Sequence, residues 1–147
     1  MNQSDIESII CFAIRKLIDN DSILINLNVS ERALMFHLAR YMREKTPENL
    51  DVDCEYNRHL ANLKNLYFLK SELNFEDEHK VYPDILIHQR NSDDNNILVV
   101  EIKKLGENLE TDFRKLKAFK SKPYSYNFAV QIVIPSDSAQ DITFNFV

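Results

Sequence analysis

The feature that most constrains the fold is a pair of apolar runs joined by a polar turn. The first run is DILIH, at residues 84–88, and the second is ILVVEIK, at residues 97–103. Both are rich in the aliphatic and β-branched residues typical of strands. The segment between them contains RNSDDNN, at residues 90–96, which favours tight turns. The sequence therefore predicts a β-hairpin over residues 84–103.

Three charged residues lie in these strands, where a plain core strand would carry none. Asp84 opens the first run, Glu101 interrupts the second, and Lys103 follows two residues later. Residues two apart in a strand share a face, so Glu101 and Lys103 point the same way, roughly 7 Å apart. Pairing in the hairpin brings Asp84 next to Glu101. Two carboxylates that close repel each other unless a cation lies between them.

This pair of acids predicts a site for a hard divalent cation. Such an ion takes a few carboxylate oxygens and a backbone carbonyl and keeps several waters. The carbonyl of Ile102, beside Glu101, is a natural further ligand. A water activated there can attack phosphorus, and Lys103 can orient that water or stabilise the charge that develops on the phosphoryl oxygens.

Helical patterns surround the hairpin. A capping-box pattern at Ser4 and Glu7 predicts a helix over about 4–19, which the residues DNDS should end. Ser30 is the expected N-cap of a helix through 31–44. Residues 59–73 also look helical. A further helix over 107–119 is expected to bury a stripe of apolar residues: Leu109, Phe113 and Leu116.

Further strands are predicted over 51–57, 128–134 and 141–147. The first alternates strictly and should present an acidic face that includes Asp51 and Asp53. Helices and strands in this order indicate an α/β fold with a central mixed sheet flanked by helices. The chain has 147 residues, which fits one domain over 1–147.

Composition excludes several classes of protein. The single glycine, Gly106, excludes glycine-rich phosphate loops. The chain lacks a signal-peptide pattern, a membrane-spanning apolar run and a disulfide framework, so we expect a cytoplasmic protein with no membrane partner. Net charge is −5, yet residues 101–122 carry seven basic and four acidic residues, a local +3. A solvated helix face explains that excess as readily as a nucleic-acid surface does.

The sequence Pro83-Asp84, followed by Glu101-Ile102-Lys103, resembles the PD-(D/E)XK nuclease superfamily, as a small bacterial member. The resemblance implies a restriction-endonuclease-like core of one helix, a three-strand meander, a second helix and a fourth strand. That core would cover about 30–134, with the helix at 4–19 and an insert at 58–80 as additions. It implies that Asp84 and Glu101 bind Mg²⁺ or Mn²⁺ and that Lys103 is catalytic.

Many members of this superfamily use an acid of the first core helix, and Glu31 is the candidate here for metal binding and catalysis. It is aligned with an apolar stripe, although a glutamate in a first helical turn also favours the helix dipole. Polar residues on the second core helix face the site in some members. Asp112 and Lys115 could do this, or could form a local salt bridge.

Two more candidates lie at the first core strand: Glu55 on its polar face and Arg58 directly after it. Glu55 either supports the site or faces solvent. Arg58 either contacts phosphate or forms a surface ion pair.

The resulting expectation is a Mg²⁺-dependent nuclease that hydrolyses DNA in preference to RNA. The alternative is a nuclease-fold binding module that works as a subunit of a larger nucleic-acid-processing or defence assembly. Low basicity favours the alternative, because a lone acidic protein holds DNA weakly. A homodimer or a partner protein would reconcile the two. A plain interaction domain without metal is a third possibility.

Overall fold

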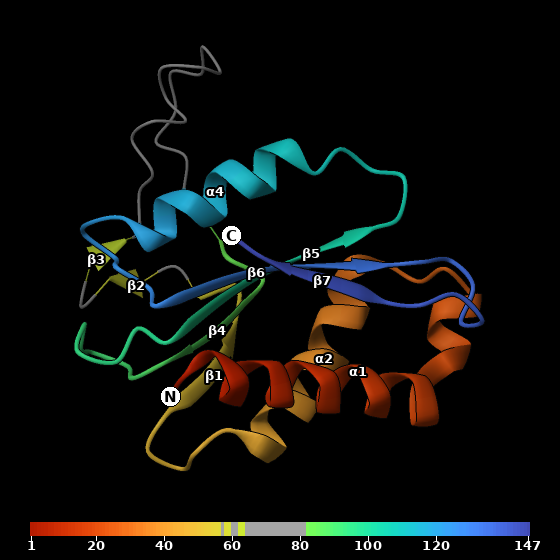
Figure 1. The fold of residues 1–147 in the computed structure, drawn as a ribbon, viewed down its shortest axis with the longest axis horizontal. Helices are drawn as coiled ribbons and strands as arrows, with labels where there is room; N and C mark the ends of the chain where they lie inside the picture. The colour runs from red at the N-terminus through yellow and green to blue at the C-terminus, as the bar shows by residue number, and fades with distance from the viewer. Residues whose placement is uncertain (57, 60–61, 64–81) are drawn as a thin grey trace.

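A five-stranded mixed sheet forms the middle of the protein in a computed structural model that describes residues 1–56, 58–59, 62–63 and 82–147 (Figure 1). The strand order is β1-β4-β5-β6-β7. The strands are β1 (Asp51–Cys54), β4 (Ile85–His88), β5 (Leu98–Lys104), β6 (Phe128–Ile134) and β7 (Thr143–Phe146). Only β5 and β6 run parallel; the neighbouring pairs are antiparallel.

Three helices of the described part of the chain flank the sheet. Helices α1 (Gln3–Asn26) and α2 (Glu31–Lys45) lie on one face and α4 (Glu110–Lys120) lies on the other (Figure 1). Alternation along β5 separates the two layers: Val100 and Ile102 pack with α1 and α2, whereas Val99 packs with Leu116 of α4. This confirms an α/β fold with a mixed sheet between helices.

The hairpin predicted over residues 84–103 is present as β4 and β5. Ile85 pairs with Val100 and Ile87 with Leu98, so the next residues along, Asp84 and Glu101, lie opposite each other at the end of the ladder. Both strands are almost wholly buried. Parallel neighbours such as β5 and β6 need a crossover, and α4 provides it.

The first helix is longer than the predicted 4–19. It begins at Gln3, and the capping box is formed by Asn2 and Asp5 rather than by Ser4 and Glu7. The residues DNDS produce a kink, with Asp21 at φ −130° and ψ 19°, but do not end the helix. Side chains of α2 hold this kink, because Asp21 accepts a hydrogen bond from Tyr41 and lies 3.0 Å from His37. Ile25, beyond the kink, is buried.

Helix α2 agrees with its prediction. Ser30 accepts a hydrogen bond from the N–H of Ala33 as the N-cap. Leu34, Leu38 and Met42 are buried. No helix among the described residues is long and apolar enough to cross a membrane.

The stripe predicted for α4 is wrong at two positions. Phe113 is exposed, with the Lys117 ammonium 4.5 Å from its ring centroid, and Leu109 is the N-cap. The residues that face the core are Leu116 and Phe119. The helix begins at Glu110, three residues after the predicted start at 107, and Leu116 is the one predicted core residue that it buries.

The strand predicted over 51–57 is shorter, because Glu55 has a φ of 49° and leaves the strand conformation. The helix predicted over 59–73 is contradicted at its start, where β2 (Arg58–His59) and β3 (Asn62–Leu63) form a short antiparallel pair. The remainder of that predicted helix, and most of the insert 58–80, lie outside the described residues.

Candidate active site

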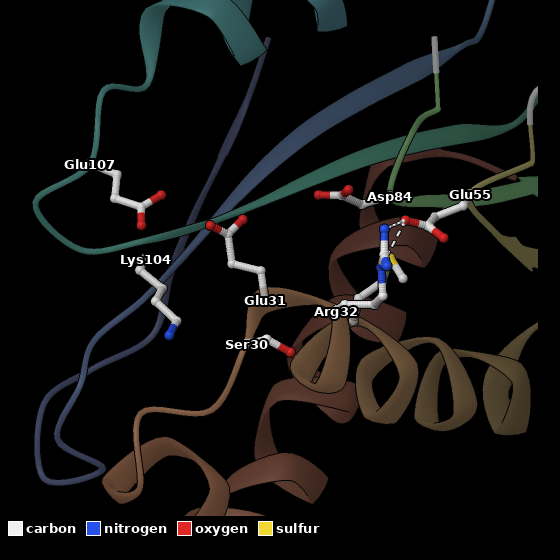
Figure 2. A pocket seen from close by; sticks show the side chains of 8 residues that line it. Ser30, Glu31, Arg32, Glu55, Asp84, Lys104 and Glu107 are labelled. Atoms are coloured by element: carbon white, nitrogen blue, oxygen red, sulfur yellow. Dashed lines mark hydrogen bonds and ion pairs between the residues drawn. The ribbon is translucent and has the colours of Figure 1, made fainter. Parts of the chain in front are cut away.

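A pocket of about 450 Å³ opens where the end of β5 meets the start of α2. Four acids line it: Glu31, Glu55, Asp84 and Glu107. Figure 2 shows the carboxylates of Glu31, Glu107 and Asp84 pointing into one space, although they come from α2, the loop after β5 and the residue before β4. Fold topology therefore gathers acids that are distant in sequence.

Asp84 is fixed by the backbone of the neighbouring strand. Its Oδ2 accepts a hydrogen bond of 2.7 Å from the N–H of Ile102. The side chain thus continues the β4–β5 ladder where the backbone pairing stops. Burial raises the pKa of Asp84 above its ordinary value, although the Ile102 bond and the charge of Lys115 oppose that rise.

Glu101 is buried, and its partner comes from α4. Lys115 Nζ lies 2.8 Å from both carboxylate oxygens and donates to Oε2. The same ammonium donates to the carbonyl of Tyr82 at 2.8 Å. Burial raises the pKa of Glu101 to about 8, because the attraction of Lys115 only partly offsets the loss of solvent and the repulsion of Asp84.

Lys103 lies on the same face of β5 as Glu101 but has different partners. Its Nζ is 3.2 Å from Asp112, 3.8 Å from Glu107 and 4.0 Å from Glu31. Burial disfavours the ammonium, but the attraction of Asp112, Glu31 and Glu107 together outweighs it and raises the pKa of Lys103. The group is therefore a cation at neutral pH.

Glu31, predicted from the apolar stripe of α2, does reach the site. Burial and a hydrogen bond with Glu107 raise its pKa to about 7. Lys103 lowers the pKa of Glu31, while Glu107 and Asp84 raise it. A carboxyl poised near neutral pH is suited to accepting or giving up a proton.

Asp112 and Lys115 also reach the site, through Lys103 and Glu101 respectively, so neither forms only a local pair along its helix. Glu55 lines the pocket but pairs with Arg32, 2.9 Å away. That pair lies at one side of the pocket (Figure 2). The side chain of Arg58 lies outside the described residues.

Glu107 is an acid of the pocket that the sequence analysis did not predict. It follows a turn at Gly106, whose φ of 93° needs glycine-like freedom, and that turn returns the chain toward β5. The signal available in the sequence was its spacing of four from Lys103. Arg32 and Lys104, which also line the pocket, were missed because neither lies in a motif.

The donor set fits a hard divalent cation, although no ligand cluster is fully assembled. Among residues 1–56 and 82–147, no three His, Cys, Asp or Glu side chains are grouped to hold one metal ion. The buried Oε1 of Glu101 receives no hydrogen bond, although the Lys115 ammonium lies 2.8 Å from it, so a cation that binds this oxygen would have to compete with Lys115. Asp84 lies in the adjacent position, and oxygen ligands are those that Mg²⁺ prefers.

The chain matches no family model, no curated protein and no solved structure.

Proposed function

We propose that this protein is a Mg²⁺-dependent nuclease that hydrolyses phosphodiester bonds in DNA. The observation that carries the proposal is the position of Asp84 and Glu101 on opposing strands, with Lys103 on the same face of the sheet. A buried acid and a half-buried acid, both with raised pKa values and beside a lysine, are typical of a site with a chemical role rather than of a sheet core.

The order of elements supports a restriction-endonuclease-like core. Helix α2, the antiparallel strands β1, β4 and β5, the crossover helix α4 and the parallel strand β6 follow in the order expected for that fold. We therefore propose membership of the PD-(D/E)XK superfamily. Fold alone does not establish an activity, so the functional argument depends on the acids and the lysine.

In this proposal Asp84, Glu101 and the carbonyl of Ile102 hold the metal, and Glu31 assists them. The N–H and C=O of one residue in a strand point to the same side. Because the Ile102 N–H points to Asp84, its carbonyl points to that side as well. Mg²⁺ held there would neutralise phosphate charge and supply an activated water.

Lys103 has a separate role. Because its pKa is raised, it acts as a cation rather than as a base. Its ammonium stabilises the negative charge that builds on the phosphoryl oxygens and orients the attacking water. Glu31, with a pKa of about 7, is placed to accept the proton that this water loses.

Incubation with plasmid and single-stranded DNA tests this function. We expect cleavage with Mg²⁺ or Mn²⁺, and none in EDTA. Asp84→Asn should abolish it, and Lys103→Ala should slow it roughly 100-fold. Cleavage that is equal in wild type and Lys103→Ala would indicate a contaminating nuclease and would remove the proposal.

A second candidate is a nuclease-fold binding module within a larger assembly. The acidic pocket favours it: of the pocket's two cations, Arg32 pairs with Glu55 and Lys104 donates to Asn28. Little positive charge is thus available there for phosphate, and the net charge is −5. A partner protein or a second copy would have to provide it. Light scattering together with DNA binding at two salt concentrations distinguishes the candidates, since a lone module should bind DNA weakly at both.

A further inference from the structure

Lys115 already forms an ion pair with Glu101, the carboxylate that we propose as a metal ligand. Its ammonium lies 2.8 Å from both oxygens of Glu101 and also donates to the Tyr82 carbonyl. The Glu101 side chain is 4% exposed and that of Lys115 is 15% exposed. The pair is therefore buried, and each charge depends on the other.

The lysines do not neutralise the site. Of the residues that the structure describes, five acids lie around it, namely Glu31, Asp84, Glu101, Glu107 and Asp112, and two lysines contact them, namely Lys103 and Lys115. With every group ionised, two minus five leaves −3. Glu101 Oε1 still receives no hydrogen bond. The resting protein thus has a counter-ion on Glu101, and the groups around it carry an excess of negative charge.

We propose that Lys115 is an internal counter-ion that competes with the divalent metal for Glu101, so that metal binding releases the ammonium. This inference rests on the proposed function, because it takes Glu101 as a metal ligand. It assigns Lys115 a positioning role: the lysine holds the Glu101 side chain in place without metal, and sets how much metal is needed to occupy the site.

Once metal has displaced it from Glu101, the Lys115 ammonium can take a second role. Lys115 Nζ is anchored on its other side by the Tyr82 carbonyl, next to Pro83 and Asp84. A lysine freed from Glu101 therefore stays beside the metal ligands and can turn to a phosphate. Binding of Mg²⁺ adds two positive charges and changes the sum of the charges around the site from −3 to −1, so the site repels an anionic substrate less when metal is present, which couples metal binding to substrate binding.

Calorimetric titration of Mg²⁺ into wild type and Lys115→Met tests the competition. Methionine keeps the length of the side chain and removes the competing charge, so we expect Mg²⁺ to bind about tenfold more tightly. Lys104→Met is the matched control, because Lys104 lines the same pocket but donates to Asn28 rather than to an acid. It removes one positive charge without freeing a carboxylate and should change the affinity much less.

Thermal unfolding in EDTA and in Mg²⁺ provides the second measurement. Lys115→Met leaves Glu101 buried without its partner, so it should unfold at a lower temperature in EDTA, and Mg²⁺ should raise its midpoint more than that of wild type. If this variant does not fold without metal, Lys115→Gln keeps a donor to Glu101 and replaces it.

The outcomes separate the two proposals. Tighter binding by Lys115→Met than by Lys104→Met supports the competition. Equal or weaker binding by Lys115→Met overturns it and leaves the nuclease proposal standing if wild type binds Mg²⁺. Binding by neither protein overturns both. Binding by Lys115→Met alone supports the competition and contradicts a Mg²⁺-dependent activity of the wild-type protein.

Discussion

Asp84 Oδ2 accepts a hydrogen bond from the N–H of Ile102, one residue beyond Glu101 on the neighbouring strand. This bond fixes where one acid lies relative to the other. It also uses a single carboxylate oxygen, so the second oxygen of Asp84 is available to a cation. The contact therefore couples strand pairing to the metal site that we propose.

Asp84→Asn should remove most of the affinity for Mg²⁺. The amide keeps the shape of the side chain but loses the charge that a hard cation requires. Calorimetry with Mg²⁺ and with Mn²⁺ measures the loss. Asp51→Asn is the control, since Asp51 lies at the opposite end of β4 beside Arg90. Unchanged binding by Asp84→Asn would contradict the assignment of this residue as a ligand.

Lys103→Ala should leave metal binding nearly intact and lower the cleavage rate roughly 100-fold, because it removes a cation that acts on the phosphoryl group. A single-turnover assay at saturating metal measures the rate. Lys117→Ala, on the exposed side of α4, should cleave like wild type. If Lys103→Ala also lost metal binding, the lysine would be structural rather than catalytic.

Without metal, stability should fall as pH rises from 5 to 8.5. The folded-state pKa values of Glu31 and Glu101, about 7 and about 8, exceed their ordinary 4.5. A carboxyl of this kind adds stability that is complete below about pH 4.5 and is lost as pH rises through the folded pKa. Thermal midpoints in EDTA measure the slope.

Glu31→Gln should flatten this pH dependence, because glutamine does not titrate. Glu48→Gln, on the exposed surface, should keep the wild-type slope. A wild-type midpoint that is constant or increases over this range would show that the acids are not stabilised in their protonated forms.

Asp53→Asn should destabilise the fold by about 2 kcal/mol, since Asp53 bonds to the buried His88 at 2.9 Å and to Arg90. Arg90 and His88 outweigh the effect of burial and lower the pKa of Asp53. The stability it contributes is therefore present above about pH 3.8 and is lost as pH falls. Chemical denaturation measures the change in the free energy of unfolding. Asp51→Asn is the control: Asp51 forms a more exposed ion pair with Arg90, so this substitution should lower the free energy of unfolding by less than about 1 kcal/mol.

Local patterns predicted the elements that lie in one stretch of chain. Ser30 capped its helix as expected, and the apolar runs with turn residues between them paired as a hairpin. Patterns failed where a distant contact decides the outcome. The residues DNDS did not end α1, because His37 and Tyr41 on another helix hold Asp21 in the kink.

The candidate site likewise contains residues that local patterns predicted and residues whose positions depend on distant contacts. Asp84, Glu101 and Lys103 were predicted as a group from strand alternation, which is a local property. Their partners depend on how α4 crosses the sheet, so the sequence left open whether Asp112 and Lys115 face the site. Glu107 gave no motif signal, because only the turn at Gly106 brings it back to Lys103.

Helix α4 performs two tasks with consecutive residues. Leu116 is buried in the apolar layer, and Lys115 beside it holds Glu101. Successive residues on a helix are rotated by about 100°, so the rotation that seats the leucine also aims the lysine. A substitution that repacks Leu116 would therefore disturb the electrostatics of the pocket without touching any charged group, and sites of this kind should evolve through their packing as much as through their acids.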